Sequence, residues 1–157
     1  MMADSRKVRI TLESVQDGSS HTHAYKGDWF RKEKSIFIRY IEPAVEGDTE
    51  AGEIRTLIRY RPEEMSVVRR GAIESEQLFV PGHRRAGSYQ SQMTSLSLEA
   101  ETLQLRLHAP GEDGVMKVMD TLPDQLPFTL EWEYELYVGD QMSGRFHIWL
   151  HIQEEQN

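Results

Sequence analysis

The chain has 157 residues, no cysteine and a formal net charge of −8 at pH 7. This length suits one domain, residues 1–157, whose core is large enough to fold without covalent crosslinks. The lack of cysteine excludes disulfides, thiolate metal sites and cysteine nucleophiles. The acidic balance argues against general nucleic-acid binding, which depends on neutralising phosphates.

The N-terminal residues lead directly into an alternating segment that begins at Val8, and no apolar signal core precedes it. No stretch approaches the roughly 20 consecutive apolar residues of a membrane-spanning helix. A chain without cysteine also fits a reducing compartment. We therefore expect a cytoplasmic protein with no membrane association.

Apolar and polar residues alternate along most of the chain, which is typical of strands with one buried face. The segment at 115–125 is ambiguous between a strand extension and a short helical turn. Within 96–107 the apolar phase changes near 100–102, which predicts a kink. The predicted strands are, in chain order, residues 8–15, 21–27, 35–42, 53–60, 65–70, 72–80, 84–91, 96–107, 128–138 and 146–152.

The clearest alternation lies in the last two predicted strands, which flank a glycine-bounded break at 139–144 and so predict an antiparallel hairpin. Matching their apolar faces suggests that Leu136 pairs with Phe146 and Tyr134 with Ile148. On the outer face this register pairs Glu135 with His147 and Glu131 with His151. The recurring turn signals and short connections predict an all-β sandwich or barrel of about eight to ten strands in up-and-down order.

Several short segments occur in a characteristic order along the chain: residues 38–42, 70–71, 89, 95–102 and 134–136, followed by Ser143 and the last alternating strand. In these segments the chain resembles the YwiB-like proteins, a bacterial family of unknown function with a calycin-like (lipocalin-like) β-barrel. It departs from the family pattern at Thr94, where a glycine is expected, and in a longer insertion at 110–127.

The resemblance implies a closed or nearly closed antiparallel barrel. Barrels of this size are filled by side chains or hold one small ligand. We therefore expect a small, anionic or amphipathic ligand in the barrel or at its mouth. An interior cavity of about 300–1,000 Å³ would favour this, and an interior filled with side chains would contradict it. No cofactor is expected. The candidate ligand-binding residues are Arg39, Tyr40, Glu42, Arg69, Arg70, Tyr89, Trp132 and Tyr134.

Two interpretations of these candidates stay open. Tyr40, Glu42 and Arg69 or Arg70 could anchor a polar ligand, because a buried charge needs a partner. The same residues could instead join strands at the barrel mouth. The alternating Trp132 and Tyr134 suit a core as well as a ligand platform.

Four histidines are weak metal-site candidates, because imidazole is a common metal ligand. His21 and His23 share one strand face, and His147 and His151 share another. The four would converge if the first and last strands met. A solvated or glutamate-paired outer face is the alternative, and we expect no metal.

Residues 55–85 carry seven arginines and four glutamates, a local charge of +3, so the remainder carries −11. These strands could pair with acidic strands or bind an acidic protein partner. Alternatively, the barrel could self-associate through an exposed strand edge, so a monomer and a homodimer both stay open. A weak nucleic-acid contact through Arg55, Arg59, Arg69 and Arg84, with Tyr60 and Tyr89 stacking on bases, is a further alternative. Phosphate-loop, serine-hydrolase and zinc-protease motifs are absent from the sequence, so we expect no enzyme.

Overall fold

The computed structural model describes residues 5–43 and 52–155. Within these ranges the chain forms antiparallel strands and no helix, and hence no membrane-spanning helix. Most of the expected acidic loop at 46–52 lies outside the described residues. The strands are β1 (Arg6–Gln16), β2 (Ser19–Lys32), β3 (Ser35–Glu42), β4 (Ile54–Arg61), β5 (Glu64–Gly71), β6 (Glu74–Phe79), β7 (Arg84–Gln90), β8 (Ser95–Pro110), β9 (Met116–Met119), β10 (Phe128–Val138) and β11 (Gln141–Glu154).

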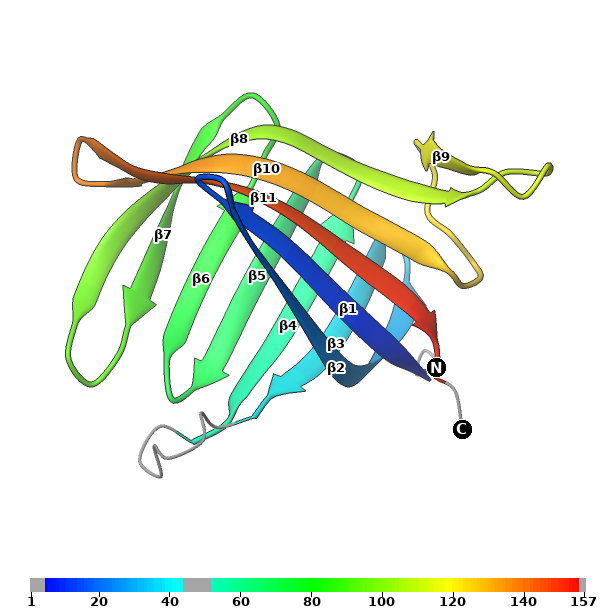
Figure 1. Ribbon diagram of the computed structural model, residues 1–157, viewed down its shortest axis with the longest axis horizontal. Coiled ribbons are helices and arrows are strands. Elements are labelled where there is room, and N and C mark those ends of the chain that lie inside the picture. The colour runs from blue at the N-terminus through cyan, green and yellow to red at the C-terminus, as the bar shows by residue number, and fades with distance from the viewer. Residues whose placement is uncertain (1–4, 44–51, 156–157) are drawn as a thin grey trace.

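Ten of these strands close into an antiparallel barrel (Figure 1). β1 to β8 follow one another in chain order, β8 also pairs with β10, and β10 and β11 lead back to β1. β9 pairs only with the end of β8, as a short flap within the segment that was ambiguous from sequence. The predicted all-β class, the up-and-down order and the closed barrel are therefore confirmed.

The predicted kink in β8 is a β-bulge. Gln104 pairs with Glu133 and Thr102 pairs with Tyr134, so Leu103 is left without a cross-strand partner. The extra residue changes the phase of the strand, which allows the apolar residues on both sides of it to face the interior.

The hairpin of β10 and β11 forms, but the register predicted for it was wrong. Tyr134 pairs with Phe146 and Leu136 with Gly144, two residues from the expected partners. The expected six-residue break is a two-residue turn at Gly139 and Asp140, followed by a bulge. Gly139 has a φ of 63°, a conformation that glycine adopts without steric cost. The apolar faces still coincide because a two-residue shift preserves strand parity.

The two ends of the barrel differ in burial. At one end, which we call the closed end, the inward side chains pack into a continuous core. At the other, the open end, inward side chains such as His23, Tyr25, Glu42 and Phe146 are partly or largely exposed. The packed residues of the closed end include Val8, Ile10, Trp29, Ile36, Tyr60, Met65, Phe79, Phe128, Leu130, Leu150 and Ile152.

Candidate functional site

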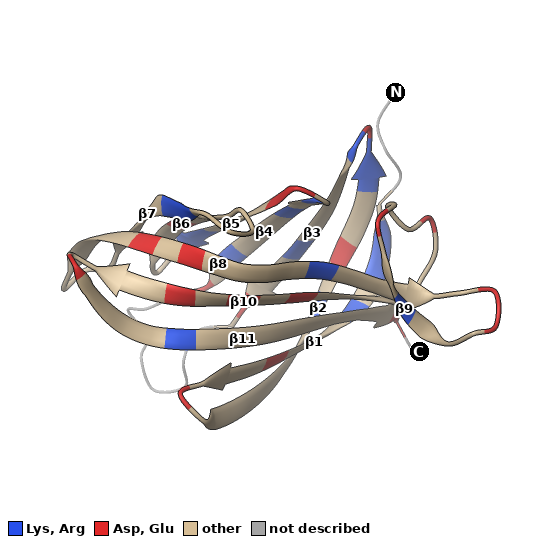
Figure 2. Cartoon of the chain, turned by 90° about the horizontal axis from the view of Figure 1, so that it is seen from above, with Lys and Arg blue, Asp and Glu red and all other residues tan. Residues whose placement is uncertain are grey.

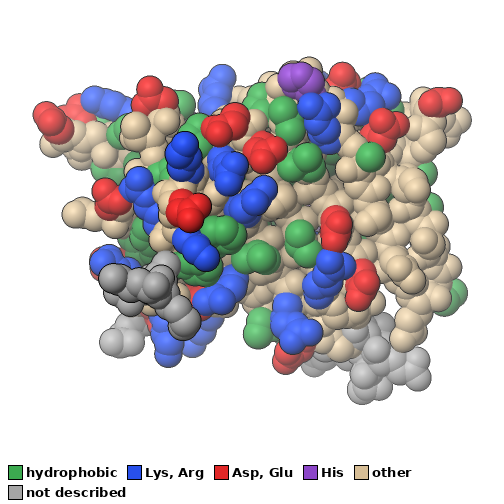
Figure 3. All heavy atoms as spheres, turned by 180° about the vertical axis from the view of Figure 1, so that it is seen from behind, with side chains coloured by type: hydrophobic (Ala, Val, Ile, Leu, Met, Phe, Trp, Pro, Cys, Tyr) green, Lys and Arg blue, Asp and Glu red, His purple; other side chains and the backbone are tan. Residues whose placement is uncertain are grey.

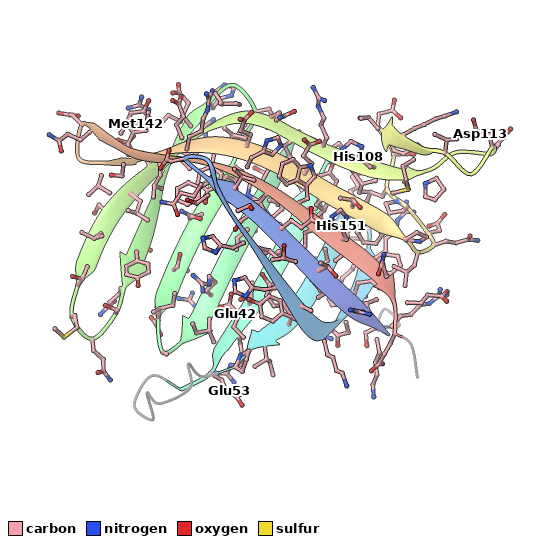
Figure 4. All side chains as sticks on the ribbon, viewed as in Figure 1. Glu42, Glu53, His108, Asp113, Met142 and His151 are labelled. Carbon is pink, nitrogen blue, oxygen red and sulfur yellow. The ribbon has the colours of Figure 1, made fainter. Side chains whose placement is uncertain are left out.

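An ion pair lies on the inner face of the barrel toward the open end. Arg69 Nη2 donates to Glu42 Oε2 at 2.6 Å, and the side chains are only 31% and 17% exposed. Glu42 continues the inner face of β3 after Tyr40 (Figure 4 labels Glu42). Arg69 faces inward because it pairs with Thr56, which itself pairs with Tyr40. Strand alternation therefore brings both charges to the same side of the sheet.

Three tyrosines complete this group, which we call the inner cluster: Tyr25, Tyr40, Glu42, Arg69 and Tyr134. The rings of Tyr25 and Tyr40 stack with their centroids 4.9 Å apart. Burial raises the pKa of all three phenols, and the positive charge of Arg69 opposes that rise in each. The cluster thus draws on β2, β3, β5 and β10, and its phenols are neutral hydrogen-bonding groups at physiological pH.

Aromatic rings line the inner face next to the cluster. Tyr134 stacks on Phe146 at 5.1 Å and packs against Phe79 at 4.7 Å. Trp132, two residues earlier on β10, is buried in the core beside Phe79. Tyr134 therefore contributes to both the core and the cluster, whereas Trp132 belongs to the core.

The remaining candidate residues are divided between the two faces of the sheet. Arg39 and Arg70 each precede or follow an inner-cluster residue, so they point outward. Tyr89 faces inward at the open end, opposite Ser75 and Leu96. The eight candidates therefore form no single site, because adjacent residues of a strand project to opposite faces.

The outward arginines pair with carboxylates. Arg39 holds Asp28 through two hydrogen bonds of 2.9 and 3.0 Å, and Arg70 Nη2 lies 2.5 Å from Glu76 Oε1. The expected pairing of arginine-bearing with acidic strands is thus present here. A groove of about 570 Å³ opens beside these arginines on the outer surface of β2 to β5. Figure 3 shows this face, where basic side chains alternate with hydrophobic and acidic ones.

The four histidines do not converge as the metal-site alternative required, and the outer face expected for all four is wrong for two of them. His23 pairs with Leu12 and His21 with Ser14, so both face inward at the open end. The other two lie on the outer face of β11. Among the described residues no group of three or more His, Asp or Glu side chains could hold a metal ion.

The outer face of β8, β10 and β11 carries a histidine–carboxylate network. Glu131 accepts hydrogen bonds from His108 Nε2 at 2.8 Å and His147 Nε2 at 2.7 Å. Burial alone would raise the pKa of Glu131, but the two imidazoles hold it below its ordinary value. Nearby, His151 Nδ1 lies 2.9 Å from Thr129 Oγ1, and its Nε2 lies 3.5 Å from Glu13 (His108 and His151 are labelled in Figure 4).

The residues proposed for a nucleic-acid contact are also separated. Arg69 is inside the barrel, and the ring of Tyr60 is buried in the core, so it cannot stack on a base. Arg84 lies over the ring of Tyr137 at 3.6 Å and 3.6 Å from Glu101. The prediction that these residues form one continuous nucleic-acid-binding surface is therefore wrong.

Tyr25 belongs to the inner cluster but was not among the residues predicted from the sequence. Tyr25 shares strand parity with His21 and His23, whose polarity suggested an outer face. The available signal was the pairing of β1 with β2 through the turn at Asp17 and Gly18, which places Tyr25 opposite Ile10.

A family model described as a domain of unknown function, DUF1934, matches residues 7–150. The uncharacterized β-barrel protein YwiB of Bacillus subtilis (strain 168) is 21% identical over 144 residues, which span 89% of this chain and 88% of that protein. The crystal structure of the ywiB protein from Bacillus subtilis matches with a TM-score of 0.74 and 17% identity, over 98% of this chain and 96% of that one.

At this identity the structural match shows the β-barrel fold and does not assign a ligand. The calycin-like relationship stays a prediction. The family match, by contrast, extends over nearly the whole barrel, from β1 into β11. The chain belongs to the DUF1934 family, whose function is unknown.

Proposed function

We propose that this protein binds a small anionic, amphipathic ligand at the open end of the barrel and catalyses no reaction on it. The observation that carries the proposal is the Arg69–Glu42 pair, a guanidinium on the inner face where burial is incomplete. Arginine has five N–H donors in a planar fork, and the bond to Glu42 uses one of them. The other donors suit a carboxylate or phosphate group.

The apolar part of such a ligand has a surface to contact. The stacked pairs of Tyr25 with Tyr40 and of Tyr134 with Phe146 stand beside the charged pair. Tyr25 and Phe146 are only partly buried, so their rings retain area that a ligand can cover. Binding sites of small molecules typically combine such apolar walls with a few convergent polar groups.

The closed end has no comparable surface for a ligand. Its inward side chains, among them Trp29, Phe79 and Phe128, are fully or almost fully buried and pack on one another. A ligand enclosed there would have to displace core residues, at a cost of several kcal/mol for each aromatic side chain. The mouth of the barrel is therefore the better-supported place.

The histidine network on the outer face resembles a catalytic triad but lacks the backbone donors that catalysis would need. Thr129, His151 and Glu13 form a hydroxyl–imidazole–carboxylate chain similar to that of a nucleophilic enzyme. However, Thr129 lies within a central strand whose backbone pairs with β8 on one side and β11 on the other. The ladders use the neighbouring backbone N–H groups, so these cannot stabilise an oxyanion.

Native mass spectrometry of protein purified directly from cells, followed by titration with the anionic aromatic dye anilinonaphthalene sulfonate, tests the proposal. We expect the native spectrum to show the added mass of a ligand that stays bound to the purified protein. We also expect saturable dye binding, which Arg69→Met should weaken about tenfold. Arg70→Met is the matched control, because it removes the adjacent arginine from the outer face. Equal dye binding by the two variants, or no retained mass together with no saturable binding, would refute the proposal.

A further inference from the structure

We infer that the outer surface of β3, β4 and β5 is a docking site for an extended, acidic segment of a partner protein. This surface is distinct from the inner cluster, because its side chains project to the opposite face of the same strands. We call it the outer groove. Its central residues are Arg39, Ile41, Arg55, Leu57, Val68 and Arg70, which line a hollow of about 570 Å³.

Cross-strand pairing sets these residues side by side. Ile41 pairs with Arg55, which pairs with Arg70, so two arginine residues stand directly opposite each other on neighbouring strands. In the next row, Leu57 lies between Arg39 and Val68. The outer groove therefore presents one basic row beside one largely apolar row.

The two facing arginines are unusual because like charges opposite each other destabilise a sheet. Arg70 is compensated by Glu76 at 2.5 Å and by Glu74 at 3.8 Å. Arg55 makes no salt bridge with any residue that the structure describes. A carboxylate supplied by a partner would therefore relieve an electrostatic conflict that the described part of the chain leaves at Arg55.

The charge of the groove is opposite in sign to that of the whole chain. Its lining has Lys26, Arg39, Arg55 and Arg70 against Asp28, which is four positive charges minus one, or +3. The whole chain carries −8, with acidic bands on β8 and β10 in Figure 2. Complementary potentials of this kind select acidic partners and speed their encounter.

The exposed apolar side chains of the groove favour an acidic protein segment over a nucleic acid as its occupant. Ile41 and Leu57 are 50% and 37% exposed, which is high for large aliphatic side chains in the middle of a sheet. The carboxylates of Asp28, Glu74 and Glu76 also border the arginines and would repel an evenly charged phosphate backbone. A peptide can place carboxylates next to Arg55 and an apolar side chain over Leu57.

Fluorescence anisotropy with a dye-labelled, twelve-residue peptide of alternating glutamate and leucine tests this inference in physiological salt. The variants are Arg55→Glu and Leu57→Ser, and the matched control is Arg9→Glu, which makes the same charge change at an exposed site on β1. We expect about tenfold weaker binding for Arg55→Glu and severalfold weaker binding for Leu57→Ser, with Arg9→Glu near the parent. Peptides with serine in place of leucine, or glutamine in place of glutamate, should bind more weakly.

Several results would overturn the inference. They are no saturable peptide binding, equal weakening by Arg55→Glu and Arg9→Glu, and tighter binding of a single-stranded oligonucleotide that Arg55→Glu abolishes. A dimer in sedimentation that Arg55→Glu dissociates would instead assign the groove to a second copy of the chain. Arg69→Met should leave peptide binding unchanged and Arg55→Glu should leave dye binding at the open end unchanged, so failure of one proposal is separable from failure of the other.

Discussion

Replacing Arg69 with methionine tests how the inner cluster is held together. Methionine keeps most of the length of the side chain but removes the guanidinium, so the carboxylate of Glu42 loses its partner at 2.6 Å. The side chain of Glu42 is only 17% exposed, so water cannot fully replace the lost hydrogen bond. We therefore expect Arg69→Met to destabilise the fold by leaving a half-desolvated charge unpaired.

The magnitude follows from the burial of the pair. Breaking a fully buried ion pair by removing one partner typically costs about 3–5 kcal/mol, whereas an exposed pair contributes about 0–1 kcal/mol. Because Arg69 is 31% exposed, the pair lies between these limits. We expect a loss of about 2 kcal/mol in the free energy of unfolding at pH 7.

Urea unfolding followed by tryptophan fluorescence measures this loss. The double variant Glu42→Gln/Arg69→Met removes the orphaned charge as well, so it should recover at least half of the lost stability. Arg70→Met, whose side chain is 48% exposed, should cost at most about 1 kcal/mol. The reasoning is refuted if Arg69→Met costs no more than Arg70→Met, or if the double variant is less stable than Arg69→Met alone.

Three further substitutions, one of them with a matched control variant, test other parts of the barrel by the same unfolding assay. Because its folded pKa lies below the ordinary 4.5, Glu131 stabilises the protein fully above that value and loses its contribution as the pH falls through the folded pKa. The stability gap between the parent and Glu131→Gln should therefore narrow from pH 6 to pH 3, and a constant gap would contradict the network. Gly27→Ala would place a Cβ 2.1 Å from the carbonyl oxygen of Arg39 and should cost about 3 kcal/mol or prevent folding, whereas Gly111→Ala, which meets mainly a flexible lysine, should cost under about 1 kcal/mol. Phe79→Leu should lower stability by about 1–2 kcal/mol, because the fully buried ring leaves a cavity; no change would mean that the closed end is loosely packed.

Strand prediction from the sequence worked best where one face of a strand is buried. The predicted strand at 128–138 coincides with β10, and the phase change in 96–107 coincides with the bulge in β8. In both cases every second side chain must enter the core, so the alternation is visible in the sequence itself. The hairpin register failed because parity alone cannot distinguish registers that differ by two residues.

Prediction of the candidate site was only partly successful. Tyr40, Glu42, Arg69 and Tyr134 do come together, and the pairing of Glu42 with an arginine was expected. The choice between Arg69 and Arg70 could not be made, because it depends on which residue of β5 faces Thr56. Tyr25 was missed because polar neighbours hid the inward face of β2.

The sequence by itself determined that this chain forms antiparallel strands with one apolar face, since that property depends on the spacing of side chains along each strand. Only the tertiary structure decided that β8 meets β10 to close the barrel, that one end packs solidly while the other is open, and that Arg69 faces inward while Arg55 faces outward. These features depend on the register between strands, which turns and bulges set, and a one-residue change in register exchanges the two faces of a strand.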